Sequence, residues 1–149
     1  MEVFSKSDIG LVRAQNQDDF RFGVISPSCV WAVVCDGMGG ANGGNIASAT
    51  AVEYISTKIT DLYKDDMTKE QIGELMAEIV MNANLRVFEL QAKDPELAGM
   101  GTTCEFVFVK DTTVHVVHPT SRTNSVPSRA MCVRMATSAY VTRYGLCPP

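Results

Sequence analysis

The chain has 149 residues, of which 46% are hydrophobic, and a formal net charge of −4. This size and composition predict one domain with a hydrophobic core. No membrane span or signal peptide is indicated, because the sequence has no long apolar run and its start has no basic region followed by a hydrophobic stretch. We therefore expect a cytoplasmic protein. The five cysteines contain no C-x-x-C pair, and Cys29, Cys35 and Cys104 lie in apolar surroundings. This usage favours reduced, buried thiols over disulfides or a zinc site.

Short strands are predicted near the amino terminus. Residues 3–5, 20–25 and 30–35 are rich in β-branched and aromatic side chains. The turn-forming sequence SPS at 26–28 joins the second and third of these segments. We expect these two strands to form a hairpin.

Two helices are predicted next. Apolar residues recur at helical spacing from Asn45 to about Tyr63. The second helix has a clearer start, because Thr68 and Gln71 form a capping-box pattern and an apolar stripe then runs from Ile72 to Leu90. Asp94 and the proline after it end this helix.

The last predicted elements are strands at 102–109 and 113–118, joined by a turn at 110–112. The order of strand, hairpin, two helices and hairpin does not alternate β and α. This order predicts an α+β fold, with a mainly antiparallel sheet and helices packed on one of its faces.

A glycine-rich turn suggests a binding site. Asp36 ends an apolar run, and five of the next eight residues are glycine. The turn lacks the lysine and hydroxyl pair of a phosphate-binding loop, and Asn42 stands where a dinucleotide fingerprint needs its third glycine. The Asp36 carboxylate and the Gly37 carbonyl are instead oxygen ligands of the kind that Mg²⁺ or Mn²⁺ prefers.

A second stretch, SDIGLVRAQNQDDF at 7–20, offers partners for such an ion. Arg13 carries a planar set of donors that suits phosphate oxygens, and Asp18 can hold a metal or a water bound to it. A phosphate and a metal could therefore share one site. A solvated surface ion pair is the alternative reading of these charges.

These stretches, together with GGNIASATAV and GMGTTCEFVFVKDTTVHVVH, resemble the bacterial type 2C serine/threonine protein phosphatases, which depend on metal. The resemblance covers residues 5–118. It implies a two-sheet β-sandwich flanked by helices and the hydrolysis of phosphoserine and phosphothreonine with two Mn²⁺ or Mg²⁺ ions. It also implies phosphorylated proteins, and a serine/threonine kinase with its substrates, as partners.

The resemblance implies roles for individual residues. Asp36 would bridge the metals, Gly37 would offer its carbonyl, Asp18 would hold water bound to a metal, and Arg13 would bind the substrate phosphate. Asn45 stands where the family usually has Glu, and its good N-capping ability suggests a capping role there.

The resemblance ends after His118. All 17 acidic residues precede residue 112, whereas residues 119–149 carry four arginines and no acid or lysine. We therefore expect residues 1–118 to be the amino-terminal half of a phosphatase domain, incomplete at its carboxyl end. Residues 119–149 are expected to be a basic tail, frame-shifted or disordered.

Three functional consequences follow from this break. Without later acids the metal centre is expected to be weak and activity low, and a binding module that grips phosphoproteins without turnover is the alternative. The missing part would expose sheet edges and apolar faces, which predicts marginal stability or aggregation. The scattered arginines have no aromatic platform beside them, so no nucleic-acid partner is expected.

Overall fold

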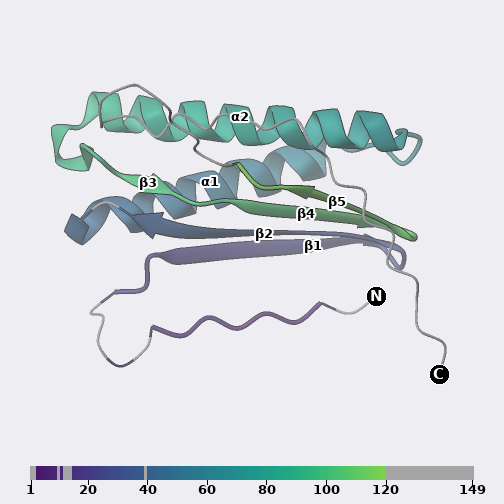
Figure 1. The fold of residues 1–149 in the computed structure, drawn as a ribbon, viewed down its shortest axis with the longest axis horizontal. Helices are drawn as coiled ribbons and strands as arrows, with labels where there is room; N and C mark the ends of the chain where they lie inside the picture. The colour runs from purple at the N-terminus through teal and green to yellow at the C-terminus, as the bar shows by residue number, and fades with distance from the viewer. Residues whose placement is uncertain (1–2, 10, 12–14, 39, 120–149) are drawn as a thin grey trace.

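The computed structural model describes residues 3–9, 11, 15–38 and 40–119 of the chain. Figure 1 shows one layer of strands with two long helices beside it. In chain order, the elements are β1 (Asp18–Ser26), β2 (Cys29–Met38), α1 (Gly40–Leu62), α2 (Lys69–Lys93), a 3₁₀ turn (Pro95–Leu97), β3 (Gly101–Thr102), β4 (Glu105–Lys110) and β5 (Thr113–Val117).

The strands form one antiparallel sheet in the order β1-β2-β4-β5, and the short β3 also pairs with β2. The two predicted hairpins are present as β1-β2 and β4-β5. The α+β class and the antiparallel sheet with helices packed against it are therefore confirmed. The described residues supply one sheet of the two-sheet architecture that the resemblance implies.

The hydrophobic core lies between the sheet and the helices. Alternate side chains of β2, among them Trp31, Val33 and Cys35, are buried there because successive side chains of a strand point to opposite faces. Helix α1 packs on β1 and β2, and α2 packs on α1 and β5. The largest fully buried side chains that meet them are Ile55, Ile59, Ile72, Met76, Phe106 and Phe108.

Helix α2 begins as its sequence predicts. The Thr68 hydroxyl accepts a hydrogen bond from the Gln71 amide at 3.3 Å, and the Gln71 side chain accepts one from the Thr68 amide at 2.9 Å. The complete capping box satisfies two backbone donors that the first helical turn would otherwise leave free.

Helix α1 begins at Gly40, five residues before the predicted start. Asn45 is therefore exposed inside the helix, and the interpretation of Asn45 as a helix cap is wrong. Close packing explains the early start in spite of the poor helix propensity of glycine. A Cβ added at Gly43 would lie 2.8 Å from the Met100 Cβ, so only a glycine lets this turn approach its neighbour.

Two strand predictions need correction. Residues 3–9 are extended but form no strand, and Phe4 in this segment is 87% exposed. In Figure 1 the segment runs beside β1, on the side of the strands away from α2, where the described chain gives it no pairing strand. The predicted strand at 102–109 is divided into β3 and β4, because Thr103 uses its side chain to bond to the backbone of β2.

The remaining predictions for the chain ends stay predictions. Residues 120–149 lie outside the described residues, and so does the predicted basic tail except for Pro119. In the part of the chain that is described, neither helix combines the length and the apolarity that a membrane span requires.

Candidate metal centre at the end of β1 and β2

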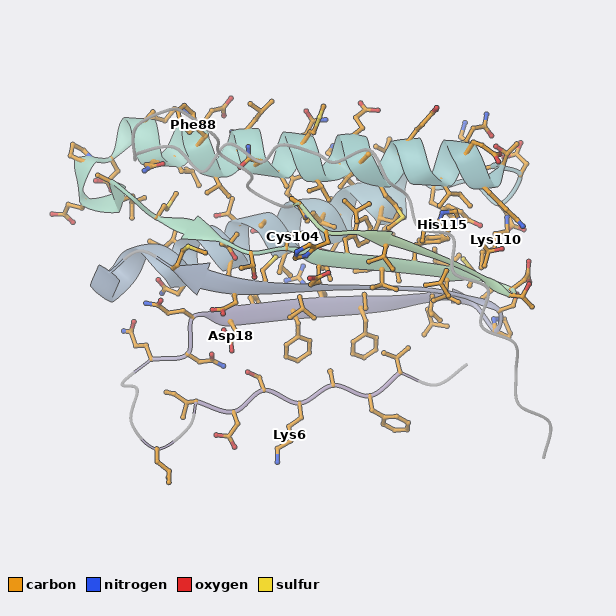
Figure 2. All side chains as sticks on the ribbon, viewed as in Figure 1. Lys6, Asp18, Phe88, Cys104, Lys110 and His115 are labelled. Atoms are coloured by element: carbon orange, nitrogen blue, oxygen red, sulfur yellow. The ribbon has the colours of Figure 1, made fainter. Side chains whose placement is uncertain are left out.

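Asp18 and Asp36 are direct neighbours across two strands. Asp18 opens β1 and pairs with Asp36 near the end of β2 in the antiparallel register. Residues directly opposite in such a pair project their side chains from the same face, about 5 Å apart at Cβ. Both aspartates are exposed. The fold therefore brings the two predicted acidic ligands together at one end of the sheet, which Asp18 marks in Figure 2.

The backbone around both aspartates is held by specific hydrogen bonds. The Asp18 amide donates to the Asn16 side-chain oxygen at 3.1 Å, which sets the entry into β1. The Asp36 amide donates to the Thr103 hydroxyl at 3.0 Å, and the Thr103 amide donates to the Asp36 carbonyl at 2.9 Å. Thr103 is thus a positioning residue that the sequence analysis missed, because no local pattern shows that it lies beside Asp36.

The backbone of Gly44 and Gln17 comes so close to residue 37 that only glycine fits there. Its amide donates to the Gln17 carbonyl at 3.0 Å, and that carbonyl also accepts from the Ser48 hydroxyl at 2.7 Å. A Cβ at Gly37 would lie 2.1 Å from the Gly44 carbonyl oxygen. The glycines at 37 and 44 therefore let the first turns of α1 close onto the end of β2. This contact, rather than space for a ligand, is what the described atoms show there.

Asp19 and Arg13, the other charged residues near this site, are not placed beside the two aspartates by the described residues. Asp19 is half-buried and lies opposite Cys35 in the register, on the other face of the sheet from Asp18. Its carboxylate accepts a hydrogen bond from the Phe20 amide at 2.8 Å. Arg13, the predicted phosphate ligand, lies outside the described residues, so its place in the site stays a prediction.

Paired carboxylates fit a divalent cation. Like charges directly opposite on neighbouring strands destabilise a sheet, and a cation between them removes that repulsion. Among the described residues, no group of three or more His, Cys, Asp or Glu side chains could hold a metal. The two paired carboxylates suit Mg²⁺ or Mn²⁺, because these hard cations prefer oxygen ligands and Mg²⁺ keeps several waters beside one or two carboxylates.

A pair of thiols lies beneath this site. The three described cysteines are free. Cys29 and Cys35 are buried, as the sequence predicts, whereas Cys104 is only half-buried. The neighbouring thiol of Cys104, together with burial, raises the pKa of Cys35. Cys104 lies close to the start of β4 in Figure 2.

Comparison with known proteins defines the class to which this fold and these paired aspartates belong. Residues 12–118 match the family model described as Protein phosphatase 2C. The chain therefore belongs to the protein phosphatase 2C family. The resemblance recognised in the sequence is confirmed at the level of the family.

Individual relatives agree with this assignment. Protein phosphatase PhpP of Streptococcus pneumoniae is 31% identical over 118 residues, which are 79% of this chain and 47% of the relative. The chain thus spans about half the length of the curated relatives it matches. The serine/threonine phosphatase PstP/Ppp of Mycobacterium tuberculosis is 27% identical with a TM-score of 0.63, covering 76% of this chain and 44% of that one.

One similar structure contains metal. It is the catalytic domain of the serine/threonine protein phosphatase PstP in complex with two manganese ions. It is 27% identical to this chain with a TM-score of 0.62, and the match covers 76% of this chain and 45% of that one.

Proposed function

We propose that this chain carries part of the active site of a metal-dependent serine/threonine protein phosphatase. The observation that carries the proposal is the direct cross-strand pairing of Asp18 with Asp36 at one exposed end of the sheet. We infer that this pair helps to bind Mn²⁺ or Mg²⁺, in keeping with membership of the protein phosphatase 2C family. Phosphorylated proteins are the substrates that we propose.

Each residue has a proposed part in the reaction. Asp36 would bind the metal directly with the Gly37 carbonyl beside it, and Asp18 would orient the water around the metal. Arg13 would bind the substrate phosphate through its guanidinium. Divalent ions would neutralise charge on the phosphoryl oxygens and lower the pKa of bound water, so no protein nucleophile is required. Thr103 would keep the Asp36 backbone in place through its two hydrogen bonds.

We propose that the activity of this chain is low. The described residues offer two carboxylates at the site, and residues 112–149 add no acid. Each carboxylate that is missing from a Mg²⁺ or Mn²⁺ site reduces its affinity. The same observation supports a second candidate, a non-catalytic module that binds phosphorylated protein without hydrolysing it. A cytoplasmic location and an association with a serine/threonine kinase and its substrates are further proposals, based on the resemblance.

Two assays separate these candidates. Hydrolysis of p-nitrophenyl phosphate with and without Mn²⁺ tests catalysis, and the anisotropy of a fluorescent phosphoserine peptide tests binding. Asp36→Asn is the site variant, and Asp66→Asn, an exposed acid in the turn before α2, is its matched control. We expect a slow Mn²⁺-dependent rate that Asp36→Asn abolishes and Asp66→Asn preserves.

The remaining outcomes are equally clear. Peptide binding without turnover, lost in Asp36→Asn, would establish the binding module. Neither hydrolysis nor peptide binding, or a rate that Asp36→Asn leaves unchanged, would contradict the assignment of this site.

A further inference from the structure

Cys35 lies in β2, and Cys104 lies opposite it in the short link between β3 and β4. On one side of them Val34 pairs with Glu105, and on the other side Gly37 pairs with Thr102. The same antiparallel register holds on both sides of the two cysteines, so Cys35 lies directly opposite Cys104. Both side chains belong to the same buried cluster of the core, Cys35 as a fully buried member and Cys104 packed against it.

The hydrogen bond between the neighbouring residues Asp36 and Thr103 indicates how far apart the Cα atoms of the two cysteines are. The Thr103 amide donates to the Asp36 carbonyl at 2.9 Å, which makes Asp36 and Thr103 the hydrogen-bonded pair. Cys35 and Cys104 are then the adjacent non-hydrogen-bonded pair, in which Cα atoms are about 4.5 Å apart. Disulfides span Cα separations of about 4.4–6.8 Å. The backbone thus already has a spacing that a disulfide can bridge.

The two thiols differ in access. Cys35 is fully buried, whereas Cys104 is half-buried in the link between β3 and β4. A small oxidant in solution can therefore reach Cys104, and the thiol of Cys35 is within contact of the product. This arrangement has the two parts of a redox-sensing pair, an accessible thiol and a resolving thiol beside it.

We propose that Cys35 and Cys104 form a reversible disulfide when the chain meets a two-electron oxidant such as hydrogen peroxide. The Cys104 sulfur attacks one peroxide oxygen and becomes a sulfenic acid, releasing hydroxide that takes up the thiol proton as water. The Cys35 sulfur then attacks the Cys104 sulfur, and the sulfenic hydroxyl leaves as a second water with the Cys35 proton. In sum, two thiols and one peroxide give one disulfide and two waters.

The cross-link would lie directly beside the proposed metal ligand. It would join the residue before Asp36 to the residue after Thr103. The cross-link would therefore be adjacent to the two hydrogen bonds that hold the Asp36 backbone. Cys104 is half-buried, and disulfides that solvent can reach are easier to reduce than buried ones, which suits a reversible modification. Any effect on metal binding rests on the proposed function, whereas formation of the disulfide does not.

Peptide mapping of the full chain tests the proposal directly. The chain is treated with hydrogen peroxide, alkylated, and digested with chymotrypsin, which cleaves after Trp31 and so separates Cys29 from Cys35. We expect a linked peptide pair that contains Cys35 and Cys104, two hydrogens lighter than the sum of its reduced parts, and lost after dithiothreitol. Links that join other cysteines instead would overturn the proposal.

Thiol counting with Ellman's reagent in denaturant gives a second measurement. In the Cys132→Ser, Cys147→Ser chain three thiols remain of the five, and we expect oxidation to leave one. Adding Cys104→Ser gives two thiols that should both survive, whereas adding Cys29→Ala should leave none after oxidation. Three surviving thiols in the parent chain would contradict the proposal. Because mapping uses the natural chain, the test does not depend on a variant that folds.

Discussion

At the scale of single residues, Gly37 and Gly73 differ in the space that surrounding atoms leave for a side chain. A Cβ at Gly37 would lie 2.1 Å from the Gly44 carbonyl oxygen and 2.6 Å from the Gln17 carbonyl oxygen. A Cβ at Gly73, inside α2, would meet nothing within 4 Å. The atoms near Gly37 belong to backbone, so they cannot move aside as the end of a flexible side chain could.

Alanine at these two positions should therefore have opposite effects. We expect Gly37→Ala to lower the free energy of unfolding by about 1–3 kcal/mol, which is the usual cost of overpacking. Gly73→Ala should raise it by about 0.5–1 kcal/mol, because glycine inside a helix costs conformational entropy. Urea unfolding followed by circular dichroism measures both. Equal effects of the two substitutions would show that the end of β2 is not packed against α1.

His115 is a buried polar residue at the other end of the sheet from Asp18, as Figure 2 shows. It is 3% exposed, and its Nε2 atom has no hydrogen-bond partner among the described residues. Burial lowers the pKa of His115 from its ordinary value of 6.5, and the charge of Lys69 lowers it further, while Glu70 acts in the opposite direction. The folded chain therefore favours the neutral imidazole.

This shift predicts that acid destabilises the fold through His115. Below its ordinary pKa of 6.5 the unfolded chain binds a proton at this residue that the folded chain resists, so stability is full above pH 6.5 and falls as the pH drops towards the lowered value. We expect the free energy of unfolding to be lower at about pH 5.5 than at about pH 7.5. His115→Phe should flatten this dependence.

The second histidine provides the control. His118 is half-exposed, and its Nδ1 atom contacts the Glu105 carboxylate. His118→Gln should leave the loss of stability between the two pH values in place. If His118→Gln rather than His115→Phe removed it, the assignment to the buried imidazole would be refuted.

At the scale of elements, helix α2 depends on its first turn. Thr68 and Gln71 bond reciprocally, and Asp94 ends the helix while its amide donates to the Leu90 carbonyl at 3.2 Å. The helix carries a buried stripe that packs against α1 and β5. Local capping and tertiary packing therefore support the same element.

We expect Thr68→Ala to destabilise the chain by about 1 kcal/mol, because it removes the cap from the Gln71 amide. Thr57→Ala is the matched control, since Thr57 is exposed within α1 and alanine favours a helix. Thermal unfolding monitored at 222 nm compares the two. A loss at Thr57 as large as that at Thr68 would argue against a specific role for the cap.

At the scale of the whole molecule, the sheet has one covered face and one open face. On the face away from the helices, Val24 and Val34 are 55% and 51% exposed, and Phe22 and Val116 are also exposed. The register places them on the same face as Asp18 and Asp36. Apolar sheet faces in folded proteins normally pack against another layer. A second sheet, as in the sandwich that the resemblance implies, would pack on this face.

We therefore expect the isolated chain to self-associate through the open face. Light scattering coupled to size-exclusion chromatography should show species larger than a monomer at micromolar concentration. Val24→Thr combined with Val34→Thr should shift the distribution towards the monomer, since threonine keeps β propensity and lowers hydrophobicity. Leu85→Gln, on the exposed side of α2, should have no such effect. A monomer before any substitution would contradict this expectation.

Much of the fold could be predicted because its signals are local. The hairpin turn at 26–28, the capping box of Thr68 and Gln71 and the stop at Asp94 all act within a few residues. The early start of α1 and the break between β3 and β4 could not be predicted. They depend on Met100 near Gly43 and on Thr103 bonded to Asp36, contacts between segments far apart in the chain.

The sequence by itself determined the family, the elements with strong local signals and the candidate metal ligand Asp36 at the end of an apolar run. Only the tertiary structure decided that Asp18 faces Asp36 and that Cys35 meets Cys104. The physical reason is strand register, since a shift of one residue would turn each of these side chains to the other face of the sheet. Register is set by turns, alternation and packing together, so it emerges when the whole sheet is assembled.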